Sequence, residues 1–132
     1  MTIGCDTSFL LRILTNHPVT LASKAIEYAY RSIRNGDSIE VSDIVLSEAY
    51  YALQASYGVS KTDALTLLAK ISSVGGFCVT SHAKEVLSTP NLANSNPGFV
   101  DRLIHGEYFA SGKKTVACEK SFKKLPQTDV VR

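Results

Sequence analysis

The alternation of two kinds of segment along the chain constrains its fold most. Short apolar runs rich in β-branched residues are separated by longer stretches with the period of amphipathic helices. This alternation is typical of a parallel sheet covered by helices on both faces. The sequence therefore predicts an α/β fold with three layers, α/β/α, around a central parallel sheet of about five strands.

The expected elements follow from the same patterns. We expect strands at residues 2–6, 38–41, 76–80, 114–118 and 128–131. Helices are expected at residues 7–15, 18–35, 43–57, 60–73, 81–89 and 98–111, with a short one at 119–124. Ser42 and Ser60 are placed to cap the helices that follow them. Residues 89–98, with two prolines and three asparagines, form the long irregular loop, and such loops often border a functional site.

Size and composition narrow the class of protein. The chain has 132 residues, enough for one compact domain with a real core, so residues 1–132 are expected to form a single domain. Its 45% apolar and 20% charged residues exclude a disordered chain. No apolar run approaches the roughly 20 residues that span a bilayer, and no secretion signal precedes the first strand, so no membrane association and a cytoplasmic location are expected.

The cysteines and histidines give no metal-binding pattern. There are three cysteines, an odd number, and no CxxC pair, so neither a disulfide framework nor a zinc site is indicated. The three histidines show no HExxH pattern. His105 lies four residues after Asp101 on one helix face, so it either reaches a site there or is an ordinary surface or hydrogen-bonded histidine.

Asp6 ends the first apolar stretch of the chain. Open α/β sheets bind their ligands at the carboxyl ends of strands, and an acid in a buried strand is tolerated best at its end. Asp is also a good N-cap for the helix expected from residue 7. From Asp6 alone, both interpretations stay open: a residue of a ligand-binding site or a helix cap.

Glu48 falls on the apolar side of its expected helix. It lies four residues after Ile44, three after Val45 and four before Ala52. Burial of an unpaired carboxylate costs several kcal/mol, so we expect a partner. No basic residue lies at helical spacing on the same helix, so the partner is either a distant arginine or a metal ion.

Two further acids occupy comparable positions. Asp101 lies in the first turn of an expected helix, where the helix dipole favours an acid. The same position would also bring the Asp101 carboxylate to the edge of the sheet. Glu119 follows the fourth strand as Asp6 follows the first, and these strands become neighbours if the sheet order reverses beside the first one. Carboxylates gathered there repel one another without a counter-ion, and Mg²⁺ or Mn²⁺ is the natural one. Such a site would activate a water for phosphoryl displacement.

The distribution of charged residues bears on whether the protein binds a polyanion such as RNA. The net charge is +2, and lysines crowd the C-terminal part of the chain at positions Lys113, Lys114, Lys120, Lys123 and Lys124. This segment is either a solvated lysine-rich face or a surface that attracts the phosphates of RNA.

Taken together, these segments resemble the PIN-domain family of small metal-dependent ribonucleases, and in size and layout the VapC toxins of toxin-antitoxin pairs. The resemblance covers nearly the whole chain, in the segments Asp6-Thr7-Ser8-Phe9-Leu10-Leu11, Leu46-Ser47-Glu48, Phe99-Val100-Asp101-Arg102-Leu103-Ile104 and Val116-Ala117-Cys118-Glu119. The family usually has Thr-Phe-Asp at the last three of these positions. The fourth acid is therefore one methylene longer here, and its neighbouring threonine is missing.

The resemblance implies a Rossmann-like sheet and a specific chemistry. The implied activity is endonucleolytic cleavage of RNA with one or two Mg²⁺ or Mn²⁺ ions. The implied metal ligands and catalytic residues are Asp6, Glu48, Asp101 and Glu119, with Ser8 assisting metal or water, and Lys113, Lys114 and Lys120 would contact the RNA backbone. Homodimerisation and a cognate antitoxin are implied as well.

Two alternatives remain. The first is a non-catalytic PIN-fold module that binds RNA or protein, with Glu119 marking a decayed site. The second is another Mg²⁺ enzyme such as a phosphatase. Phosphatases with an aspartyl nucleophile usually carry a second acid two residues later, where this chain has Ser8.

Overall fold

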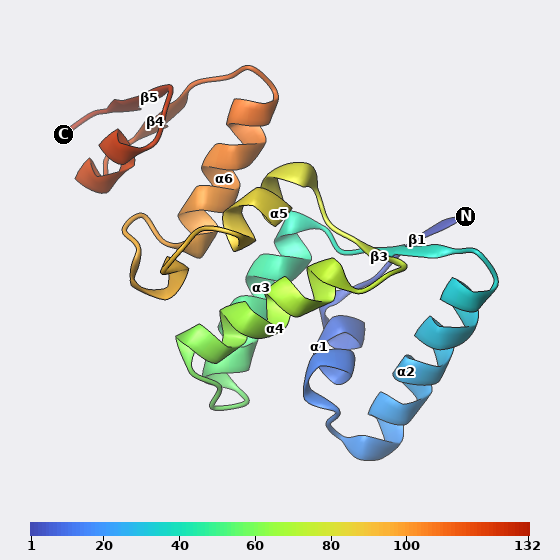
Figure 1. Cartoon of the computed structure of the whole chain (residues 1–132). Coiled ribbons are helices and arrows are strands. Elements are labelled where there is room, and N and C mark those ends of the chain that lie inside the picture. Colours follow the sequence, from blue (N-terminus) through green and yellow to red (C-terminus); the bar gives the residue numbers. More distant parts are fainter. The chain divides into compact units, whose positions relative to one another are not determined.

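The computed structural model describes all of residues 1–132 and shows an α/β protein (Figure 1). Its internal contacts divide the chain into two compact units, Met1–Thr80 and Ser81–Arg132. A single domain over the whole chain stays a prediction. None of the helices has both the length and the apolar character needed to cross a membrane.

The first unit contains a parallel sheet of three strands. These are β1 (Thr2–Gly4), β2 (Ser38–Glu40) and β3 (Phe77–Cys78), in the order β1-β2-β3. Ile3 pairs with Ile39, which pairs in turn with Phe77. Four helices connect the strands: α1 (Thr7–Thr15), α2 (Val19–Arg34), α3 (Asp43–Ala55) and α4 (Lys61–Ser73). Helix α1 packs against α2 and α3, and α3 packs against α4.

Side-chain caps set the starts of three of these helices. The Ser42 hydroxyl accepts a hydrogen bond from the backbone amide of Val45, and the Ser60 hydroxyl accepts one from Asp63. Both caps were expected from the sequence. Asp6 caps α1 in the same way, which places this carboxylate at the junction between β1 and α1.

The core of the first unit lies between the helices and the sheet. Its fully buried side chains include Leu10, Val41, Leu46, Leu53 and Leu68. Burial of these aliphatic side chains removes apolar surface from water, the main favourable contribution to folding.

A glycine is required where α4 gives way to β3. Gly76 has a φ of +92°, and a Cβ built on it would lie 2.5 Å from the side chain of Ile33. Only a glycine combines this backbone conformation with so close an approach of α2.

The second unit contains α5 (Ser81–Leu87), α6 (Phe99–Ala110) and a parallel pair of strands, β4 (Thr115–Ala117) and β5 (Thr128–Val130). Two short 3₁₀ helices complete it, η1 (Leu92–Asn94) and η2 (Lys120–Lys124). Helices α5 and α6 pack closely. A Cβ built on Gly106 of α6 would lie 3.2 Å from the Cβ of His82, so this glycine permits the close approach.

The predicted α/β class is confirmed, and so are its elements. All five expected strands are present and parallel to their partners, each ending one or two residues early, and all seven expected helices are present. The hydrogen bonds divide the strands into a sheet of three and a sheet of two, where one sheet of about five was expected. Helix η1 was not expected, because a helix of three residues is too short to produce a periodic pattern.

Candidate functional site

The carboxyl ends of the three parallel strands meet at one edge of the first unit. The backbone amide of Cys5 donates to the Glu40 carbonyl at 3.1 Å, and that of Val41 donates to the Cys78 carbonyl at 2.8 Å, so the ladder extends just beyond each strand. The chain then enters α1 after Asp6 and α3 at Asp43. This edge is the position at which open parallel sheets bind ligands.

Asp6 is exposed at this edge and held in one orientation. Its Oδ1 accepts hydrogen bonds from the Phe9 backbone amide and from the Ser8 hydroxyl, both at 2.9 Å. The Phe9 amide first, and then the Ser8 hydroxyl, hold the pKa of Asp6 below its ordinary value of 3.8, and the charge of Arg12 adds to this. The carboxylate is therefore ionised at neutral pH, and its Oδ2 is left for a ligand.

Glu48 is tied to the same place through Thr7. The Thr7 hydroxyl donates to Glu48 Oε1 at 2.6 Å, which links the start of α1 to the middle of α3. The predicted burial of Glu48 is wrong, because Glu48 is exposed. Ile44, one turn earlier on the same side of α3, is 73% exposed, and the buried face of the helix carries Leu46 and Leu53. The partner of Glu48 in this unit is a hydroxyl group, where an arginine or a metal ion was expected.

A small pocket lies beside Asp6. It has a volume of about 320 Å³ and is lined by Cys5, Asp6, Phe9 and Tyr28 together with residues of β1 and β2. The rings of Phe9 and Tyr28 meet edge to face with their centroids 6.0 Å apart. Burial, and secondly the charge of Asp6, raise the pKa of the Cys5 thiol to about 11. Cys5 is therefore a neutral thiol at physiological pH and a poor nucleophile or metal ligand.

Asp43 is an acid at this edge that the sequence reasoning missed. Its Oδ1 accepts a hydrogen bond from the Thr80 hydroxyl at 2.9 Å, which joins the start of α3 to the end of the first unit. The signal was present, since Asp43 follows β2 much as Asp6 follows β1. The helix dipole also favours an acid in a first turn, so this position alone does not distinguish a site residue from a structural one.

The other two predicted acids belong to the second unit. Asp101 is partly exposed in the first turn of α6, as expected, and Glu119 is exposed at the start of η2 without a capping hydrogen bond. Within either unit, no group of three or more His, Cys, Asp or Glu side chains is arranged to hold a metal ion. In the first unit Glu48 is hydrogen-bonded to Thr7, the residue that follows Asp6, and the convergence of all four acids stays a prediction.

The donor set of the first unit fits a hard divalent cation. Asp6 and Glu48 each use one carboxylate oxygen in hydrogen bonds to the start of α1, and each keeps a second oxygen. Mg²⁺ retains several waters and is commonly bound through only one or two carboxylates. Two exposed carboxylates fixed by hydroxyl and amide donors meet this requirement.

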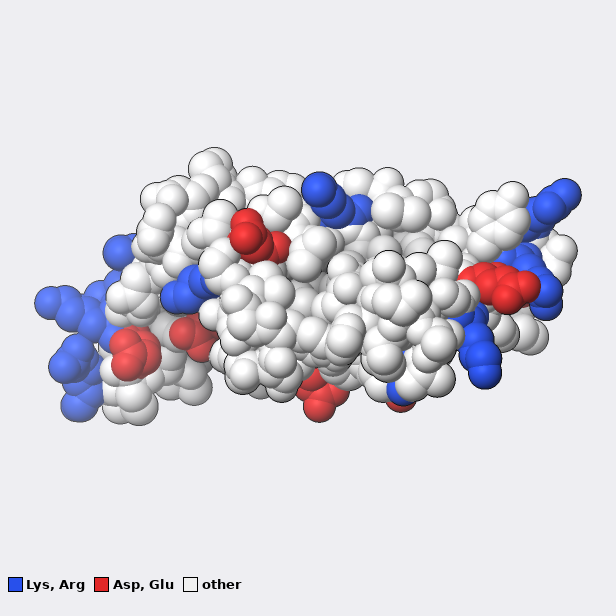
Figure 2. All heavy atoms as spheres, turned by 90° about the horizontal axis from the view of Figure 1, so that it is seen from below, with Lys and Arg blue, Asp and Glu red and all other residues white.

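The predicted RNA-contacting lysines lie on the surface of the second unit. Lys113, Lys114 and Lys120 are all exposed. Lys114 forms an ion pair with Asp129 at 3.2 Å, and both side chains are exposed, so the pair adds little stability. Figure 2 shows Lys and Arg atoms gathered around the C-terminal elements. A basic surface is present, and its contact with RNA stays a prediction.

His105 is buried in the second unit. Its Nδ1 forms a hydrogen bond of 2.9 Å with the Thr115 hydroxyl, whereas its Nε2 is buried without a partner. Burial, and secondly the charge of Arg102, lower the pKa of His105. The imidazole is therefore neutral at physiological pH and is only partly satisfied in its hydrogen bonding.

Comparisons with known proteins give one structural likeness. No protein family model matches this sequence, and no curated protein matches it. Among solved structures, VapBC2 from Rickettsia felis bound to a DNA fragment from their promoter is similar, with a TM-score of 0.45 and 18% identity over 99% of this chain and 98% of the other. A likeness at this level assigns neither an activity nor a partner to this chain.

Proposed function

We propose that this protein is a divalent-metal-dependent endoribonuclease of the PIN type and the toxin of a VapBC-type toxin-antitoxin pair. The observation that carries the proposal is the arrangement of Asp6 and Glu48. An ionised carboxylate at the carboxyl end of β1 is linked, through the adjacent Thr7, to a second carboxylate on α3. The resemblance of the segments around these acids to PIN domains supplies the reaction class.

Each residue has a role that follows from its contacts. Asp6 and Glu48 would hold Mg²⁺ or Mn²⁺, one ion or two, with Asp101 and Glu119 completing the ligand set. The bound cation would supply an activated water and stabilise charge on the phosphate in an in-line displacement. The Ser8 hydroxyl and the Phe9 amide fix the direction of the Asp6 carboxylate, and the Thr7 hydroxyl fixes Glu48.

The proposal also assigns the partners. The substrate is RNA, whose phosphates are attracted by Lys113, Lys114 and Lys120 on the exposed surface of the second unit. A cognate antitoxin would block the acidic site, and two copies of the chain would form a homodimer.

Cleavage of a mixed RNA substrate by the purified full chain tests the proposal. We expect cleavage with Mg²⁺, its loss in EDTA and its return on addition of Mg²⁺ or Mn²⁺. Asp6→Asn and Glu48→Gln should each lower the rate by roughly 100-fold or more, because even loss of a residue that only orients a metal ligand typically costs about 10–100-fold. Asp63→Asn is a matched control, because Asp63 is an exposed first-turn acid of α4. Equal cleavage in Mg²⁺, in EDTA and after Asp6→Asn would overturn the mechanism.

A second candidate is a non-catalytic module with the same fold that binds RNA or protein. The observation that favours it is the exposure of Glu119, the acid that departs from the family pattern, with no hydrogen bond to fix its side chain. This candidate would be favoured if the protein binds RNA but never cleaves it with Mg²⁺ or Mn²⁺. The Asp6→Asn variant should then bind RNA as well as the wild type does.

A further inference from the structure

The second unit contains a pocket of about 540 Å³ that the proposed nuclease activity does not use. Its walls are one face of α5, one face of α6 and the chain just after η2, at Leu125 and Pro126. From α6 come Arg102, His105 and Phe109, spaced by three and four residues and so on one side of the helix. The volume lies in the range of small-molecule sites, roughly 300 to 1,000 Å³.

His105 lines this pocket, and its Nε2 is buried there without a hydrogen-bond partner. His105 and Thr115 are 6% and 4% exposed, and the Thr115 hydroxyl has His105 Nδ1 as its partner. If the hydroxyl donates to Nδ1, the proton of the neutral ring is on Nε2 and only that group lacks a partner. The opposite assignment leaves both the hydroxyl proton and the Nε2 lone pair unsatisfied. Because unsatisfied buried groups are costly, the first assignment holds, and Nε2–H awaits an acceptor.

Arg102 adds a second donor one turn away. Its Nε donates to the Pro97 carbonyl at 2.8 Å, which anchors the guanidinium and leaves the Nη groups for a ligand. Its charge is near enough to His105 to contribute to the lowered pKa of that ring. The α6 wall of the pocket therefore contains two hydrogen-bond donors: the charged Arg102 guanidinium and the neutral, buried Nε2–H of His105.

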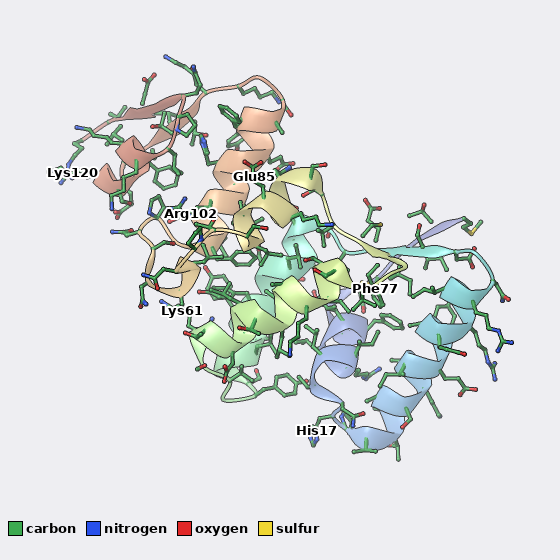
Figure 3. The ribbon with its side chains drawn as sticks, viewed as in Figure 1. His17, Lys61, Phe77, Glu85, Arg102 and Lys120 are labelled. Carbon is green, nitrogen blue, oxygen red and sulfur yellow. The ribbon has the colours of Figure 1, made fainter.

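The α5 side presents an acceptor. Glu85 lines the pocket with an exposed carboxylate, and Figure 3 shows Glu85 on α5 and Arg102 on α6. The Phe109 ring also lines the pocket and is 48% exposed, so it offers a flat apolar surface. A small anion would meet the donors and be repelled by Glu85, whereas a planar ring with acceptors on one edge and donors on the next would satisfy both sides.

We infer that this pocket binds a guanine base, free in a nucleotide or in single-stranded RNA. The Glu85 carboxylate would accept hydrogen bonds from the N1–H and the 2-amino group. Arg102 and the His105 Nε2–H would donate to the O6 and N7 acceptors, and the base would pack on Phe109. Adenine has an acceptor where guanine has N1–H, so it would meet the Glu85 carboxylate unfavourably. Only the idea that the base comes from RNA rests on the proposed function. Binding of a free guanine nucleotide does not depend on it.

Titration of the full chain with GMP, IMP and AMP, followed by calorimetry or NMR chemical shifts, tests this inference. The three nucleotides share the ribose phosphate, so differences between them report on the base. GMP should bind about tenfold or more tightly than AMP, and IMP, which lacks the 2-amino group, should fall between them. Glu85→Gln should reduce the preference for GMP over AMP to about twofold, because the carboxylate that accepts from N1–H and the 2-amino group is lost. The variant should fold normally, because Glu85 is exposed. Glu107→Gln is the matched control, because Glu107 is an exposed acid of α6 that does not line the pocket.

The outcomes separate this inference from the proposed nuclease activity. No binding of GMP by the folded protein, equal affinity for GMP and AMP, or a GMP preference that survives Glu85→Gln would overturn it. Asp6→Asn should bind GMP as the wild type does, because the pocket contains none of the four predicted catalytic acids. If the protein binds GMP selectively but never cleaves RNA, the guanine site stands and the nuclease proposal fails. If it cleaves RNA with Mg²⁺ but does not bind GMP selectively, the nuclease proposal stands and the guanine site fails.

Discussion

Replacement of Asp6 by two different residues separates its role as a helix cap from its role in the site. Its Oδ1 accepts from the Phe9 amide and the Ser8 hydroxyl, both at 2.9 Å. Asp6→Ala removes this acceptor and should cost about 1 kcal/mol, the usual value for an N-cap. For a chain of 132 residues this lowers Tm by about 4 °C. Asp6→Asn keeps an acceptor oxygen in the same place, so its stability should stay within about 0.5 kcal/mol of the wild type.

The pH dependence of the free energy of unfolding shows whether the charge of Asp6 stabilises the folded protein. The pKa of Asp6 is lowered in the folded protein from 3.8, chiefly by the Phe9 amide. Its stabilising effect is therefore complete at pH values well above 3.8 and is lost as the pH falls through 3.8 and below. The change is small because Asp6 is exposed and its charge is screened. Asp6→Asn should lack this acid-dependent step.

Urea unfolding followed by circular dichroism at pH 7, 5 and 3, with cleavage assays on the same preparations, measures both roles. We expect both variants to cleave RNA at least roughly 100-fold more slowly than the wild type. At pH 7 Asp6→Asn should be nearly as stable as the wild type, and Asp6→Ala should be less stable. Equal destabilisation by Asn and Ala would refute capping through Oδ1. Full Mg²⁺-dependent cleavage by a folded Asp6→Asn would show that Asp6 is a cap and nothing more.

Two further predictions concern the first unit and one exposed thiol. Gly76→Ala should destabilise the protein by about 1–3 kcal/mol, because the new Cβ meets Ile33 at a φ of +92°, whereas Gly75→Ala, with open space around it, should change the urea midpoint little. Iodoacetamide at pH 8 should modify the exposed Cys118 well before Cys5, whose pKa is raised to about 11, and peptide mass spectrometry that finds equal rates would contradict the burial of Cys5.

The fold was largely predictable because local patterns are strong in this chain. Apolar runs, helical periodicity and caps such as Ser42 and Ser60 act over a few residues, and they located every strand and all but the shortest helix. The division of the strands into two sheets depends on backbone hydrogen bonds between distant segments. No short window of sequence carries that information.

The site was predicted less completely, because the same residue types serve two purposes. Ile44 made Glu48 look buried, yet this isoleucine is 73% exposed, and periodicity cannot distinguish an apolar residue in the core from one on the surface.

Asp43 was not considered as a site residue. It lies in the first turn of α3, where the helix dipole alone accounts for an acid. Thr7 was not considered from the sequence, although its hydroxyl holds the Glu48 carboxylate at the start of α1, directly after Asp6. A neutral donor fixes the direction of a carboxylate without supplying a charge, as Thr7 does for Glu48 and Ser8 does for Asp6. The residues that orient a carboxylate site are thus the hardest to find from sequence, because they are neither charged nor periodic.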